Sequence, residues 1–174
     1  APLLGTFFRA LARKGLGQPY LPLLESLDEV TGDLDAECTD NLSEILFLFG
    51  KESTSAYLTG AIREFQDAGV QSKTLDLILA RILMSQEQYA EAGAVLEKVL
   101  ARYGTDKHVH YLLATVYESL DRVPETEAQL RACLALEPDD TDVLNFLGYF
   151  YAEKKMKLDE AEQLLNKALE KQPD

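Results

Sequence analysis

Two histidines, His108 and His110, are the residues of this chain whose type could hold a metal ion or act as a general base. The apolar residues around them recur at helical spacing, and helical residues two positions apart point about 200° away from each other. The two rings therefore cannot bind one metal ion together. We expect His110 to pack between helices and His108 to face a groove, and we predict no metal site.

The two cysteines, Cys38 and Cys133, offer the other candidate chemistry. They lie in different predicted helices, and neither belongs to a C-x-x-C pair or to a spacing typical of zinc sites. The sequence identifies no base that would activate either thiol. We favour two reduced, packed thiols over a disulfide bond.

No further enzyme motif stands out in the sequence. Gly15–Gly17 lacks the third glycine of a dinucleotide fingerprint and is followed by Pro19, so we interpret it as a turn between helices. There is no nucleophile elbow, zinc-protease helix or phosphate loop. Acid pairs such as Asp139-Asp140 and Asp159-Glu160 are typical of helix caps and solvated faces. We therefore predict that the chain is not an enzyme and uses no cofactor.

Composition narrows the class of protein further. The chain has 174 residues, of which 47% are hydrophobic and 27% charged, a balance typical of a globular protein. A formal net charge of −13 argues against nucleic acid as a partner, although the first twenty residues contain Arg9, Arg13, Lys14 and no acid. No apolar run approaches the roughly 20 residues of a membrane span. We expect a soluble protein, cytoplasmic or periplasmic, whose partner is a protein or peptide rather than a nucleic acid or a membrane.

One pattern of residues recurs three times along the chain. The last occurrence comprises Leu144, Leu147-Gly148, Tyr151, Ala161, Leu165, Ala168 and Pro173. The middle occurrence comprises Leu113-Ala114, Tyr117, Thr126, Leu130, Cys133 and Pro138. The first comprises Leu79-Ala80, Leu83, Ala92, Leu96, Val99 and Gly104. One extra residue lies between Lys154 and Leu158 in the last unit.

This succession resembles the tetratricopeptide repeat family, and the last unit is similar to those of many bacterial members. The resemblance implies an all-α fold, a right-handed superhelical stack of antiparallel helix pairs. The units are 73–106, 107–140 and 141–174. Small residues are expected where the paired helices cross: Ala80, Ala92, Ala114, Gly148, Ala161 and Ala168.

Helix boundaries are indicated by local signals. Thr105-Asp106 and Asp139–Thr141 offer capping oxygens, and Pro124 suits the first position of a helix. Upstream of the repeats, residues 36–72 are predicted to form a divergent helix pair, 40–50 and 53–68. Ser53–Ser55 would cap the second helix of that pair and Gly69 would end it.

The whole chain, 1–174, is predicted to be one helical-repeat domain. Its first part, 1–35, would hold two helices, 2–14 and 19–30, which brings the total to about ten helices. The helix 2–14 is apolar and basic, so alternatives to its packing on the second helix are a membrane-surface position or a place in the groove of the array.

The resemblance also implies which positions face the concave groove, where helical repeats bind partners. These positions are Thr74, Leu77, Arg81 and Met84 in the first unit, His108, Tyr111, Thr115 and Glu118 in the second, and Asp142, Asn145, Tyr149 and Ala152 in the third.

We expect nine of these residues to bind a peptide or a segment of a partner protein: Leu77, Arg81, Met84, His108, Tyr111, Thr115, Glu118, Asn145 and Tyr149. Aromatic and methionine side chains suit such binding. The alternative is that Tyr111 and Tyr149 only cover neighbouring helices. The basic and amide clamp with which some family members hold a C-terminal carboxylate is absent, so we predict no recognition of that kind.

The most direct interpretation is a non-catalytic scaffold or assembly factor. Two alternatives stay open: an envelope-associated factor anchored by its basic N-terminus, and the non-catalytic part of a larger enzyme. The chain begins without Met and stops at Asp174, which leaves an apolar face around Leu158, Leu165 and Leu169 without a partner. We expect either that the natural protein continues or that this face makes a homo-oligomer.

Overall fold

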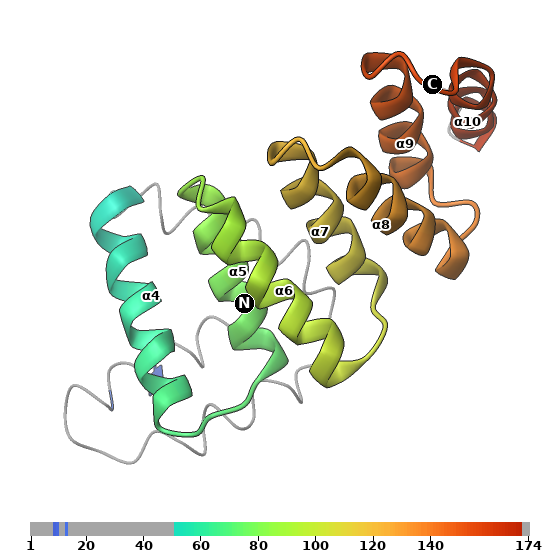
Figure 1. Cartoon of the computed structure of the whole chain (residues 1–174). Coiled ribbons are helices and arrows are strands. Elements are labelled where there is room, and N and C mark those ends of the chain that lie inside the picture. Colours follow the sequence, from blue (N-terminus) through green and yellow to red (C-terminus); the bar gives the residue numbers. More distant parts are fainter. Residues whose placement is uncertain (1–8, 11–12, 14–50, 172–174) are drawn as a thin grey trace. The chain divides into compact units, whose positions relative to one another are not determined.

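The computed structural model describes Arg9, Ala10, Arg13 and residues 51–171, and the regular elements within these residues are all helices (Figure 1). They are α4 (Lys51–Asp67), α5 (Lys73–Ser85), α6 (Tyr89–Tyr103), α7 (Lys107–Ser119), α8 (Val123–Leu136), α9 (Thr141–Glu153) and α10 (Leu158–Lys171). The prediction of an all-helical fold is confirmed for this part of the chain.

The predicted count of about ten helices is not matched, because the described residues contain seven. The helices predicted over 2–14, 19–30 and 40–50 fall outside the described residues, apart from Arg9, Ala10 and Arg13, which are helical. Chain contacts divide the protein into two compact units, Ala1–Val99 and Leu100–Asp174. The prediction of one repeat domain stays a prediction.

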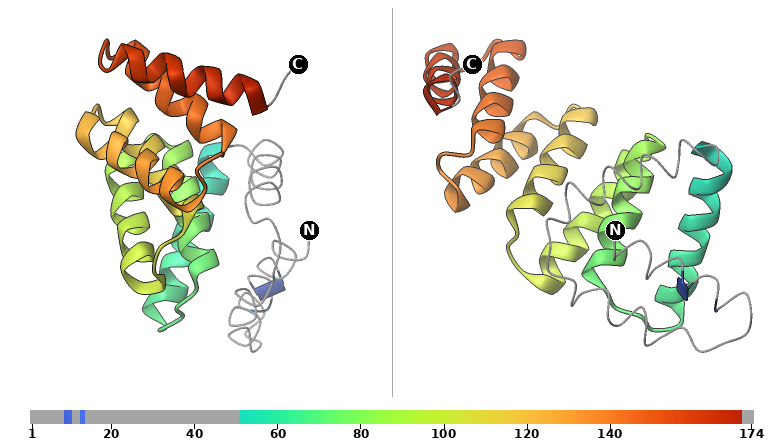
Figure 2. Two further views of the ribbon diagram at one scale, coloured as in Figure 1. Left: turned by 90° about the vertical axis from the view of Figure 1, so that its right-hand side faces the viewer. Right: turned by 180° about the vertical axis from the view of Figure 1, so that it is seen from behind.

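Helices that follow each other in the chain pack as pairs within each unit. In the first unit α4 packs on α5. In the second unit α7 packs on α8 and α9 on α10, while α8 also contacts α9 (Figure 2). Because only a few residues join the members of a pair, the two helices run in opposite directions.

The start of every odd-numbered helix repeats at a fixed interval. α5, α7 and α9 begin at Lys73, Lys107 and Thr141, thirty-four residues apart. Each is capped by the residue before it, where Ser72, Asp106 and Asp140 accept hydrogen bonds from the backbone N–H groups of the first turn. A capping oxygen of this kind stabilises a helix by about 1 kcal/mol. Asp106 and Asp140 were predicted as caps, and Ser72 extends the series.

The turns that follow the odd-numbered helices repeat at the same interval. Glu87, Asp121 and Lys155 adopt the left-handed conformation, with φ of 61°, 54° and 53°. The next residue in each turn donates its N–H to a carbonyl in the last helical turn, that of Leu83, Tyr117 or Tyr151. The last turn carries one residue more than the others, and Lys157, with φ 48°, is a second left-handed residue there. The predicted insertion between Lys154 and Leu158 is thus confirmed.

One boundary prediction upstream is wrong. Ser53–Ser55 was expected to cap a helix, but α4 already includes Lys51, so these residues lie inside the helix. The predicted end is right: α4 ends at Asp67, and Gly69 follows with a φ of 90° that favours glycine.

The small residues that were predicted at the helix crossings are buried. Ala80, Ala92 and Ala114 are 0% exposed, and Ala161 and Ala168 are 3% and 2% exposed. In the second unit, buried residues from α7 to α10 form one apolar cluster: Ala114, Leu130, Cys133, Val143, Leu147, Phe150, Tyr151 and Ala161. This cluster fixes the position of α9 between its neighbours.

Two leucines of α10 are exposed among polar residues. Leu158 is 58% and Leu169 is 64% exposed, whereas Leu165 is half-buried because it packs against Gly148 of α9. A contact between copies of the chain through this face stays a prediction.

The close approach of α10 to Gly148 of α9 can be tested by substitution. A Cβ atom on Gly148 would lie 2.7 Å from Leu165 Cγ and 3.2 Å from the Ala161 carbonyl oxygen. Gly148→Ala should therefore lower the free energy of unfolding by about 1–3 kcal/mol, measured by urea denaturation.

Gly60 of α4 is the matched control for this substitution. A Cβ atom at Gly60 would meet nothing within 4 Å. Gly60→Ala should therefore stabilise the protein by up to about 1 kcal/mol through helix propensity alone. Equal effects of the two substitutions would contradict the close crossing of α9 and α10.

Candidate functional site

Helices α7 and α9 lie side by side in the second unit and run in the same direction. At one end Lys107 Nζ, in the first turn of α7, lies 2.5 Å from Asp140 Oδ2, which caps α9. In the middle the rings of Tyr111 and Phe146 meet edge to face, with centroids 5.7 Å apart. At the other end Lys154 Nζ, which follows α9, lies 2.6 Å from Asp121 Oδ1, which follows α7. These three contacts fix the register of the two helices.

The Asp140 side chain both caps α9 and binds Lys107 of α7. Its Oδ1 accepts hydrogen bonds of 3.0 Å from the N–H groups of Asp142 and Val143, and its Oδ2 accepts one from Lys107. Burial alone would raise the pKa of Asp140, but the hydrogen bonds from Lys107 and from the backbone lower it overall. The pKa of Lys107 is raised by its hydrogen bonds to Asp140 and then Glu137. The start of α9 is therefore tied to the start of α7.

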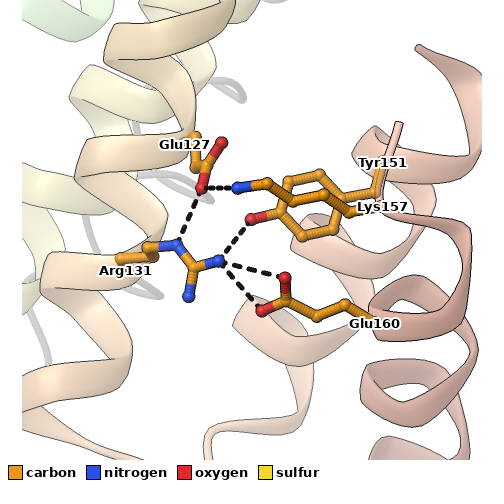
Figure 3. Close-up of polar contacts among 5 residues, drawn as sticks. All are labelled: Glu127, Arg131, Tyr151, Lys157 and Glu160. Atoms are coloured by element: carbon orange, nitrogen blue, oxygen red, sulfur yellow. Dashed lines mark hydrogen bonds and ion pairs between the residues drawn. The ribbon is translucent and has the colours of Figure 1, made fainter. Parts of the chain in front are cut away.

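A second polar cluster holds α9 against α8 and α10 (Figure 3). The guanidinium of Arg131 on α8 donates to Glu127, to the Tyr151 hydroxyl and to Glu160 on α10, each at 2.9 Å. Glu127 also accepts a hydrogen bond from Lys157, whose Nζ lies 5.1 Å from the centre of the Tyr151 ring. One arginine, at the centre of a cluster of five residues, thus joins three helices and fixes the rotation of α9.

The predicted groove positions of the second unit lie on α7 and α9. On each helix they are spaced three, four and three residues apart, which places them on a single stripe. We call the set the α7–α9 face: His108, Tyr111, Thr115, Glu118, Asp142, Asn145, Tyr149 and Ala152. Tyr149, Asp142 and Ala152 are exposed, and the other five are half-buried.

The aromatic residues of the face differ sharply in exposure. Tyr149 is 66% exposed, although its neighbours on α9, Phe150 and Tyr151, are 2% and 0% exposed. Tyr111 is held by Phe146, and Thr115 donates its hydroxyl proton to the Tyr111 carbonyl at 3.1 Å. Phe146 is not one of the predicted groove positions, and nothing in the sequence around it marks it as the residue that packs on Tyr111.

The predicted groove residues of the first unit have different surroundings. Leu77 is 6% and Thr74 is 3% exposed, while Arg81 and Met84 are half-buried. α5 is buried on almost every side, including Asp76, whose Oδ1 accepts a hydrogen bond from Gln66 Nε2. The continuous apolar run from Leu77 to Ala80 was the signal that this helix is surrounded. The structure thus places Leu77 in the core.

The candidate chemical groups are held in structural roles. His110 Nδ1 lies 2.6 Å from Gln129 Oε1, between α7 and α8. The Cys133 thiol is free, donates to the Lys107 carbonyl at 3.4 Å and is buried, which raises its pKa to about 11. Cys38 lies outside the described residues. Within the described ranges, no group of three or more His, Cys, Asp or Glu residues could hold a metal ion.

The part of the chain that the structure describes has no helix with the length and apolar character needed to cross a membrane. Its fold, a series of antiparallel helix pairs repeated every thirty-four residues, defines a helical repeat protein, a class that generally binds other proteins without catalysing a reaction. The tetratricopeptide repeat family matches residues 83–147. The chain is a tetratricopeptide repeat protein.

Known proteins show the same relationship. A TPR repeat-containing protein of Pseudomonas aeruginosa is 30% identical over 133 residues, which are 76% of this chain. The match spans 22% of the length of that relative. Among solved structures, MamA from Desulfovibrio magneticus RS-1 has a TM-score of 0.65 at 17% identity, covering 99% of this chain and 98% of that chain. The TPR protein YrrB has a TM-score of 0.64 at 18% identity, covering 95% and 84%.

The cluster around Arg131 predicts a dependence of stability on pH. Burial would raise the pKa of Glu127, but the hydrogen bonds from Lys157 and Arg131 lower it overall from 4.5 to about 2. Because the carboxylate is favoured in the folded state, its contribution is complete above about pH 4.5 and is lost as the pH falls towards 2.

Glu127→Gln should lower the free energy of unfolding by roughly 1 kcal/mol at neutral pH, since solvent still reaches this group. Urea denaturation at a series of pH values should show the difference from the wild type shrinking between pH 4.5 and 2. Glu162→Gln on the exposed side of α10 is the control and should follow the wild type. A difference that stays constant down to pH 2 would contradict the assignment.

Proposed function

We propose that this chain is a non-catalytic module that binds a segment of a partner protein on the α7–α9 face. Tyr149 carries the proposal. Its side chain is 66% exposed on a helix whose other large apolar residues are packed. Exposed tyrosines on rigid elements are frequent centres of protein interfaces.

The surroundings of Tyr149 support a binding surface rather than a loose side chain. α9 is tied to α7 through Asp140 and to α8 and α10 through Arg131. A partner that packs on Tyr149 therefore meets a surface that is already ordered, which lowers the entropic cost of binding. Tyr111 and Asn145 would extend the contact along the face, with Thr115, His108 and Glu118 as polar partners.

The comparisons support the class of function. Tetratricopeptide arrays are protein-binding scaffolds, and the solved YrrB structure, similar in fold, is described as having an unusual peptide-binding site. The half-buried Arg81 and Met84 belong to α5 in the first unit and are not needed for the proposed contact. A scaffold or assembly role follows from binding without catalysis.

The test is affinity capture from the source cells with the intact chain and with Tyr149→Ala. Removing this ring should weaken capture of a groove partner by roughly tenfold, and it should leave helix content by circular dichroism unchanged because the residue is exposed. Proteins captured by both forms equally would place the binding site elsewhere and would contradict the proposal.

Tyr57 of α4 supplies a matched control. It is 62% exposed, close to the value for Tyr149, but belongs to a different helix and unit. Tyr57→Ala should capture the partner as the intact chain does. A loss with both variants would indicate a general effect of exposed tyrosine on recovery rather than a site.

A further inference from the structure

The charges of the α7–α9 face are all of one sign at neutral pH. Asp142 lies at the end where α9 begins, and Glu118 lies near the end of α7. Glu153 lies one turn after Tyr149, at the end of α9, and adds a third, exposed carboxylate. Of the ion pairs formed among the described residues, none includes any of these three side chains.

The nearest cations at both ends of the face are held by other acids. Lys107 Nζ lies 2.6 Å from Glu137 and 2.5 Å from Asp140. Lys154 Nζ lies 2.6 Å from Asp121, and the charges of Glu153 and Glu118 also act on it at longer range. Because three acids share this lysine, negative charge remains at this end to attract a cation from solution or from a partner.

The pKa of Tyr111, in the middle of the face, responds to these negative charges. Burial raises the pKa of its hydroxyl, and the nearby charges of Asp142, Asp140 and Glu118 raise it further. An acid on α7 and acids at the start of α9 thus act on one side chain, so negative charge from both helices reaches the middle of the face.

We propose that the segment bound on the α7–α9 face is cationic, with Lys or Arg residues on both sides of an apolar side chain that packs on Tyr149. This inference rests on the proposed function and specifies the chemistry of the partner. Complementary charge speeds association and excludes wrong partners. An acidic tail, a nucleic acid or an anionic membrane would be repelled.

The positions of the acids suggest the spacing of the cations. Asp142 and Glu153 are eleven residues apart, about 16 Å along the axis of α9. An extended peptide covers this distance in about five residues. The bound segment should therefore carry two cations about five positions apart, with the apolar residue between them.

The test is selection of a phage-displayed library of random peptides on the intact chain, with Tyr149→Ala used to remove peptides that do not depend on the face. Enrichment of peptides with spaced Lys or Arg around an apolar residue is expected. Enrichment of neutral or acidic peptides that depend on Tyr149 would overturn this inference but leave the proposed function standing. If no enriched peptide depends on Tyr149, both this inference and the proposed function are contradicted.

The most enriched cationic peptide is then measured by fluorescence anisotropy. Glu118→Gln/Asp142→Asn should weaken its binding by about fivefold at low salt, and this difference should shrink as salt is added. Glu162→Gln/Glu170→Gln on α10 removes the same charge outside the face and should leave binding unchanged. Equal losses with both variants would show attraction to the acidic chain as a whole and would overturn the inference.

A second copy of the chain is the other possible occupant of this face. Sedimentation of the intact chain and of Tyr149→Ala distinguishes it, with both expected to behave alike. Self-association that Tyr149→Ala abolishes would overturn the proposal of a cationic partner segment.

Discussion

The carboxylate of Asp140 is the interaction on which the arrangement of the second unit depends. One oxygen caps α9 by accepting two backbone hydrogen bonds, and the other binds Lys107 at the start of α7. A cap alone would stabilise one helix, and an ion pair alone would join two helices loosely. Their union in one side chain aligns α7 and α9, so that residues thirty-four or thirty-five positions apart, such as Tyr111 and Phe146, come into contact.

The remaining freedom of α9 is its rotation about its own axis, and this is set on the opposite side by packing and by Arg131. The missing side chain of Gly148 lets Leu165 of α10 approach closely. Arg131 then bonds the Tyr151 hydroxyl and Glu160. Polar contacts of exposed groups stabilise weakly one by one, but several that share a residue restrict geometry. The outward position of Tyr149 is the consequence.

The face that results joins an ordered apolar centre to unpaired acids at its ends. Several bases of the second unit bind acids on a neighbouring helix, as in the pairs of Lys167 and Lys171 with Asp139. Glu118 and Asp142 form no such pair among the described residues, and they lie on either side of Tyr111 on the face. The overall charge of −13 would suit solubility alone, but the distribution of that charge indicates the kind of partner.

Short-range features were predictable from the sequence, because caps, left-handed turns and the interval of thirty-four residues depend on neighbouring residues. Asp106, Asp140, the insertion before Leu158 and the small residues at Ala161 and Gly148 all lie as predicted. Burial depends on what packs against a helix. The apolar run that begins at Leu77 indicates a surrounded helix, but the tertiary structure was needed to show that Leu77 is in the core while Tyr149 faces solvent. Contacts such as Arg131 with Glu160 likewise join residues about thirty positions apart, and their existence depends on how closely the helices approach. The sequence determined the repeat and its boundaries, and the packing of the repeats decided which of its residues can meet a partner.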